Sequence, residues 1–97
     1  MATSYIIINV KVSSGKFEGV DFDNRIFLCY TNDSSKYLVC GSNTDTLKMR
    51  KDSFVYCMKS NKLQESQLPG NVIVPVFDKY GYMTDFTLTN PETGEVI

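Results

Sequence analysis

The strongest constraint on the fold is a two-residue alternation of apolar and polar side chains in short runs along the chain. Such alternation places every second side chain on one face, as in a half-buried β-strand. It is clearest at 71–88, where alternating valines precede a turn at 78–81 and a second alternating run follows. Gly81 can adopt a positive φ, so this segment predicts a β-hairpin. Pro75 donates no ladder hydrogen bond, which places its strand at an edge or beside a bulge.

Four other segments have strand character, and the residues between them favour turns. The four segments are 4–12, 20–30, 36–40 and 54–58. In the first of them, the apolar side chains predicted to share one face are Ile6, Ile8, Val10 and Val12. Ser13-Ser14-Gly15 then predicts a turn or the start of a longer flexible arm, and the polar cluster at 31–35 predicts a second turn.

The longest candidate strand, 20–30, changes character along its length. Phe22 and Tyr30 lie an even number of positions apart and are predicted to share one face. The opposite face of its first half carries Asp21, Asp23 and Arg25. The second half is apolar on both faces, which is typical of a long barrel strand that becomes covered on both sides.

Three segments do not fit the strand pattern. Thr44 or Asp45 can cap a short helix across 44–52, but the apolar spacing is poor and the segment stays ambiguous. The polar stretch 61–70 ends in a Pro-Gly pair and predicts a loop. Residues 90–97 are expected to form a flexible acidic tail.

Five or six short strands without a long helix indicate an all-β domain. Valine, isoleucine and threonine supply 23 of the 97 residues and alanine one, a balance that favours strands. A small five-stranded OB-like barrel over 1–89, with one short helix near 44–52 as an option, is the economical fold, because closure removes exposed strand edges. A β-sandwich is the alternative.

The residue types present argue against catalysis. Histidine is absent, which excludes Ser-His-Asp, Cys-His and His-bearing zinc sites. Cys29, Cys40 and Cys57 have no C-x-x-C spacing and stand among apolar residues, so they are predicted to be buried and reduced. Gly15-Lys16 lacks the spacing of a phosphate-binding loop. We therefore expect no enzyme activity, no catalytic residues, no metal site and no cofactor.

Charge and exposed aromatic residues favour a binding function. The net charge is −1, yet 48–62 holds five basic residues and one acidic residue, which together attract phosphates. Tyr80 lies beside Lys79 at the predicted hairpin turn, where a ring buries little surface. Exposed rings cost solubility unless they serve a surface, and unpaired bases stack on such rings.

Two stretches resemble the filamentous-phage gene V-type single-stranded DNA-binding proteins. The first is Phe22-Asp23-Asn24-Arg25-Ile26-Phe27-Leu28-Cys29-Tyr30, with Gly15-Lys16 upstream, and the second is the hairpin at 77–88. The resemblance implies a dimeric OB-like barrel that coats single strands, with Phe22, Tyr30 and Tyr80 stacking on bases and Lys16 in a DNA-binding wing. The acidic residues at 18–23 depart from the family's basic pattern.

Two functions from different classes remain open from the sequence. The first is sequence-tolerant binding of single-stranded DNA or RNA by a homodimer from a phage or mobile element. Its expected contact residues are Lys16, Phe22, Arg25, Tyr30, Lys48, Arg50, Lys51 and Tyr80. The alternative is a protein–protein interaction module of a virion or host-takeover factor. Neither signal peptide nor membrane-length apolar run is evident, so a cytoplasmic location away from membranes is expected.

Overall fold

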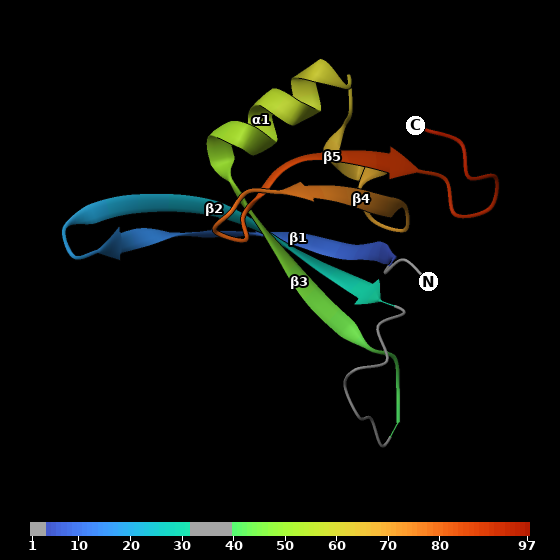
Figure 1. Ribbon diagram of the computed structural model, residues 1–97, viewed down its shortest axis with the longest axis horizontal. Helices are drawn as coiled ribbons and strands as arrows, with labels where there is room; N and C mark the ends of the chain where they lie inside the picture. Colours follow the sequence, from blue (N-terminus) through green and yellow to red (C-terminus); the bar gives the residue numbers. More distant parts are fainter. Residues whose placement is uncertain (1–3, 32–39) are drawn as a thin grey trace.

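The structure is a computed structural model that describes residues 4–31 and 40–97. Its elements are β1 (Tyr5–Phe17), β2 (Val20–Thr31), β3 (Thr44–Arg50), α1 (Lys51–Ser60), the 3-10 turn η1 (Glu65–Gln67), β4 (Val72–Phe77) and β5 (Met83–Thr89). The five strands close into a barrel in the order β1-β2-β3-β5-β4, with α1 outside it (Figure 1). Neighbours are antiparallel except β3 and β5, which meet in parallel at Met49 and Met83. The predicted small all-β, OB-like barrel is confirmed.

The barrel interior is filled by apolar side chains from all five strands and from α1. The Phe27 ring lies at its centre, fully buried, with the rings of Phe54 and Phe86 edge-on to it at centroid separations of 5.9 and 5.6 Å. Edge-to-face pairs of this kind stabilise a core beyond the area they bury, by about 1 kcal/mol each. Phe54 comes from α1, so the helix closes one end of the core rather than lying free in solvent.

The β1–β2 hairpin is longer than the sequence suggests. The turn predicted at Ser13-Ser14-Gly15 is wrong, because β1 continues through these residues to Phe17. The chain reverses at Glu18 and Gly19, whose φ angles of 51° and 79° are those of a two-residue turn matched to strand twist. Both strands run past the end of β3, so the hairpin projects beyond the barrel (Figure 1).

A bulge in β1 changes which side chains face the core. The pairing with β2 shifts register between Ile7 and Asn9, so one extra residue is inserted there. Ile7 is buried before the bulge, and Val10 packs against the core after it. The prediction of one face shared by all four alternate apolar residues of this strand is therefore wrong.

In the segment after residue 43, the structure has a strand where a helix was the option and a helix where a strand was predicted. Thr44–Arg50 is strand, with Leu47 and Met49 buried at alternate positions, so the optional short helix is present but its predicted position near 44–52 is wrong. The strand predicted at 54–58 lies instead within α1. Phe54, Cys57 and Met58 have the helical i, i+3, i+4 spacing and are its buried residues.

The C-terminal hairpin is confirmed, with β4 and β5 paired across the predicted turn. Gly81 has a φ of 85°, as expected. The Asp78 side chain accepts hydrogen bonds from the backbone amides of Tyr80 and Tyr82, which fixes the turn. Pro75 lies beyond the short stretch where β4 pairs with β1, so its missing donor disturbs no ladder on that side.

The remaining expectations concern 36–40 and the two chain ends. Residues 36–39 lie outside the described part of the chain, and Cys40 is exposed, contrary to the prediction that all three cysteines are buried. Near the C-terminus, Val96 bridges Thr89 and the Ile97 amide donates to the Leu88 carbonyl at 2.9 Å. Across residues 4–31 and 40–97, no helix has the length and apolar character needed to cross a membrane.

Candidate functional site

The outward face of the β1–β2–β3 sheet carries a row of basic side chains. In the strand register Lys11 lies opposite Ile26 and Ile26 opposite Lys48, while Asn24 lies opposite Arg50. Directly opposed residues of neighbouring strands point to the same face of a sheet. Lys11, Lys48 and Arg50 therefore lie on one surface, away from the core.

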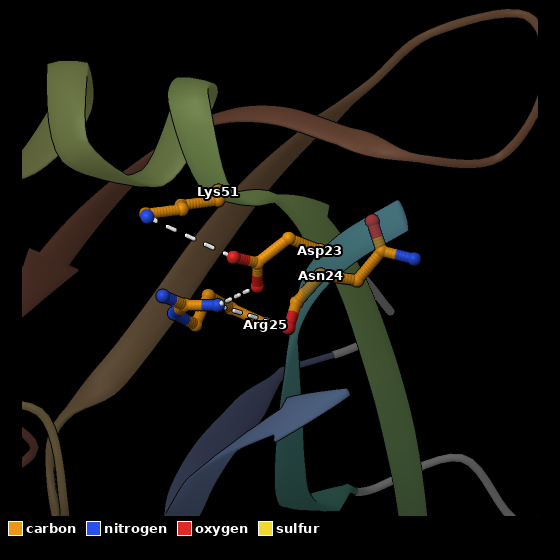
Figure 2. Close-up of polar contacts among 4 residues, drawn as sticks. All are labelled: Asp23, Asn24, Arg25 and Lys51. Carbon is orange, nitrogen blue, oxygen red and sulfur yellow. Dashed lines mark hydrogen bonds and ion pairs between the residues drawn. The ribbon is translucent and has the colours of Figure 1, made fainter. Parts of the chain in front are cut away.

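The carboxylates of the same three strands lie on the other face. Asp21 pairs with Lys16, Asp23 with Ser14, and Asp45 with the buried Cys29, all of them core-side positions. Alternation along β2 separates Asp23 from Asn24, and Figure 2 shows their side chains leaving the strand in opposite directions. The acidic sequence around 21–23 thus places no carboxylate among the outward-facing residues of these strands.

Apolar side chains occupy the same outward face where the hairpin projects. Phe17 and Val20 face each other at its tip and are 70% and 69% exposed. Phe22 lies next along the face, and its ring packs over Gly15, where a Cβ atom would lie only 3.1 Å from the ring. The absence of a side chain at residue 15 lets the Phe22 ring lie along the hairpin, with 39% of the residue exposed.

Tyr82 joins this face from the β4–β5 loop. The Arg50 guanidinium carbon lies 4.7 Å from the centre of the Tyr82 ring, and the Lys48 ammonium lies 5.5 Å from it. Both distances are in the range of cation–π attraction. The ring therefore holds two flexible cations near each other, at the point where β3 approaches the start of β5.

Two adjoining hollows run between the hairpin and Tyr82. The larger is about 470 Å³, and the one beside it, toward the start of α1, is about 390 Å³. Both are lined by Val20, Phe22, Asn24 and Tyr82, so together they form one groove. Lys48 lines the larger hollow, while Arg50 and Lys51 line the smaller one together with the carboxylates of Asp21, Asp23 and Asp52. We call this the hairpin groove.

The structure brings four of the predicted contact residues into the hairpin groove and a fifth onto its face. Phe22, Lys48, Arg50 and Lys51 line the groove. Tyr30 is exposed on the same outward face of β2, eight positions further along, a span of about 26 Å at the usual rise of a strand. The prediction that Phe22 and Tyr30 share a face is confirmed by their partners in the register, Gly15 and Ile6.

Three predicted contact residues lie outside the groove lining, and Lys51, within it, is engaged in an ion pair. Arg25 points to the core-side face, where its guanidinium lies 6.0 Å from the centre of the Phe54 ring. Lys16 lies 3.8 Å from Asp21, and Lys51 borders the groove 3.7 Å from Asp23. Tyr80 is exposed at the tip of the β4–β5 loop, beside Lys79 and outside the groove lining.

Four groove or face residues were missed from the sequence. Tyr82 was not among the predicted contact residues, although it supplies the ring between Lys48 and Arg50. Phe17 and Val20 became site residues only because the hairpin turn lies between them. Lys11 alternates with apolar neighbours in the sequence, and that pattern places it outside the core.

The two buried thiols offer no nucleophile near neutral pH. Burial, with a smaller effect of Asp45, raises the pKa of the Cys29 thiol to about 11. Burial and the hydrogen bond to Asp85 raise the pKa of the Cys57 thiol to about 11 as well. The Cys57 Sγ donates to Asp85 Oδ1 at 3.0 Å, which ties α1 to β5. Both thiols are therefore structural.

The chemistry available at the hairpin groove is stacking, cation pairing and hydrogen bonding. In the part of the chain that the structure describes, no group of three or more metal-ligating side chains is placed to hold a metal ion. Comparisons with models of protein families, with curated proteins and with solved structures found no match for this chain.

Proposed function

We propose that this chain binds single-stranded nucleic acid, above all single-stranded DNA, with little sequence preference. In this proposal the bound strand lies along the outward face of β1–β2–β3 and passes through the hairpin groove. Strands 2 and 3 and the loops of the first and last hairpins form the surface through which OB-type barrels bind oligonucleotides. The hairpin groove occupies that position.

One observation carries the proposal: apolar rings and cations meet in the hairpin groove, and the outward face of β1–β2–β3 beside it carries cations but no carboxylate. Phe22 and Tyr82 line both hollows, and Lys48 and Arg50 line one each. A strand of unpaired bases presents flat apolar faces alternating with phosphates. Ring-and-cation surfaces match both features without reading base edges.

The groove favours unpaired strands over duplex for a steric reason. A base stacks on a protein ring only when its own face is free, and in a duplex both faces are already stacked on neighbouring bases. Phe22, lying along the hairpin, offers one ring face to the groove. Lys48, Arg50 and Lys11 then neutralise phosphates along the same face, which makes binding depend on salt.

The experiment is a titration of fluorescent oligo-dT at low and high salt, on the wild type and on Phe22→Ala. We expect binding at low salt that weakens as salt rises, and a loss of about 1–2 kcal/mol in Phe22→Ala from the lost stack. Phe77→Ala is the matched control, because Phe77 is 45% exposed on β4 and is not among the residues that line the groove. Equal losses in the two variants, or no binding by the wild type at low salt, would remove the proposal.

A second candidate function, protein–protein interaction, is favoured by one observation. Val74 and Val76 alternate along β4 and are each about half exposed, on a face of the barrel away from the hairpin groove. Exposed valines at alternate positions form an apolar strip suited to a partner protein or to a second copy in a homodimer. Sedimentation velocity of the wild type and of Val76→Lys distinguishes a partner protein from a second copy of this chain. If the wild type is a dimer and the Val76→Lys variant is a monomer, the contact between the two copies lies at this strip.

A further inference from the structure

The Asp23 carboxylate lies between two cations, those of Arg25 and Lys51 (Figure 2). Asp23 also lines the smaller hollow of the hairpin groove. Arg25 Nη1 donates to Asp23 Oδ1 at 2.5 Å, and the same nitrogen donates to the Asn24 carbonyl at 3.3 Å. The second carboxylate oxygen, Oδ2, lies 3.7 Å from the Lys51 ammonium. One carboxylate thus uses both its oxygens on cations from two elements, β2 and the first residue of α1.

The two ion pairs differ in their exposure to solvent. The Arg25 side chain is only 16% exposed and its guanidinium lies against the Phe54 ring, so this pair is held from behind by the core. The Lys51 side chain is 51% exposed and borders the hairpin groove. A solvent-exposed pair is weak and is screened by salt, whereas a partly buried pair persists. Lys51 is therefore the partner that exchanges readily.

A phosphodiester offers Lys51 the same kind of partner that Asp23 offers it, an anionic oxygen. We propose that Asp23 sets the affinity of the hairpin groove by competing with strand phosphate for Lys51, an inference that rests on the proposed function. In the unbound protein Lys51 pairs with Asp23. When a strand occupies the groove, Lys51 turns to a phosphate, while Arg25 keeps Asp23 in place and neutralised.

This competition accounts for an acidic residue beside a groove that binds an anion. Removing the carboxylate frees Lys51 before the strand arrives and removes a negative charge facing the backbone. At the spacing of these groups, one screened unit charge changes an affinity by about fivefold. An added phosphate contact steepens the dependence of log affinity on log salt by about 0.7 for a single strand.

The test measures oligo-dT affinity against salt for Asp23→Asn, Lys51→Gln and the double variant, with Asp21→Asn as matched control. Asp21→Asn removes the same charge two positions away on the same face of β2, where the carboxylate lies near Lys16 instead. We expect Asp23→Asn to bind about fivefold tighter with a steeper slope, and Asp21→Asn to gain less than half of that. Lys51→Gln should cost less than twofold alone and about fivefold in the Asp23→Asn background.

The possible outcomes distinguish a failure of the competition from a failure of the proposed function. A wild type that binds, with equal gains in Asp23→Asn and Asp21→Asn, overturns the competition and leaves the proposed function standing. Lys51→Gln costs that are the same in both backgrounds overturn it too. A general loss of stability in Asp23→Asn does not mimic the result, because both proteins compared in that background carry the same substitution. A wild type that fails to bind oligo-dT removes the proposed function, and this inference with it.

Discussion

Replacing Tyr82 by alanine is expected to weaken oligo-dT binding about 100-fold, or about 3 kcal/mol, near the upper end for the loss of one stacking ring. The effect is large because the ring does two things. It lines both hollows of the hairpin groove, and it holds Arg50 and Lys48 by cation–π contacts at 4.7 and 5.5 Å. Without the ring, two cations lose their fixed position and must be ordered by the ligand, which costs affinity.

Two variants separate this role from a general effect of losing a tyrosine. Tyr82→Phe keeps the ring and should bind within about twofold of the wild type, since a phenyl ring also stacks and attracts cations. Tyr56→Ala removes a tyrosine that is 75% exposed on α1 and should leave affinity unchanged. Fluorescence anisotropy gives all three affinities. A Tyr82→Ala affinity within threefold of the wild type would contradict the role assigned to the ring.

Alkaline pH is expected to destabilise the fold strongly between pH 9 and 11 through its two buried thiols. Cys29 and Cys57 have pKa values of about 11 in the folded protein against an ordinary 9.0. Below pH 9 both states keep the proton and stability is fully present. Above pH 9 the unfolded chain releases it first, so the free energy of unfolding falls until the folded protein ionises near pH 11. Each thiol contributes roughly 2–3 kcal/mol to this loss.

Urea unfolding at about pH 8, 9, 10 and 11 measures this loss, because this range brackets the ordinary and the raised pKa of the thiols. Cysteine variants serve as controls. Cys57→Ala lowers stability at all pH values but should flatten the decline by about half, because one of the two protons is gone. Cys40→Ala is the control for the loss of a cysteine as such, since that residue is exposed. A decline that is equally steep in Cys57→Ala would show that ionisation of the Cys57 thiol does not contribute to the fall in the free energy of unfolding.

The barrel was predictable because much of its pattern is local. The β4–β5 hairpin follows from alternating residues around a turn with a suitable glycine, and both the alternation and the turn are visible within 71–88. The alternation of β2 also gave the shared face of Phe22 and Tyr30. These features depend on neighbouring residues alone, which is why one sequence suffices to predict them.

The helix was missed because two local signals conflict in it. Val55 and the aromatic residues on either side of it favour a strand by propensity. The spacing of Phe54, Cys57 and Met58 favours a helix, and in the structure these three residues pack into the core. Burial of a helical stripe outweighs propensity over ten residues. The bulge in β1 was hidden for a related reason, because one inserted residue leaves the apolar composition unchanged.

The candidate site was only partly predictable because it joins segments distant in sequence. Tyr82 meets Lys48 and Arg50 because β3 and β5 are neighbours at Met49 and Met83, a pairing that no local pattern reveals. The acidic stretch around Asp23 argued against an anion-binding surface when it was counted by sequence. In the structure Asp21 and Asp23 lie on the face opposite the basic row, yet both line the smaller hollow of the groove, where Asp23 pairs with Arg25 and Lys51.

The most direct test of the account is an NMR titration that follows backbone amide shifts of the ¹⁵N-labelled protein as oligo-dT is added. The account predicts that the perturbed amides cluster on the outward face and around the hairpin groove, at Phe22, Asn24, Lys48, Arg50 and Tyr82. The shifts of the amides at 55–60 in α1, and of Val74 and Val76, should stay unchanged. Perturbations confined to β4 and α1, or none at saturating oligo-dT, would contradict the claim that this groove holds an unpaired strand.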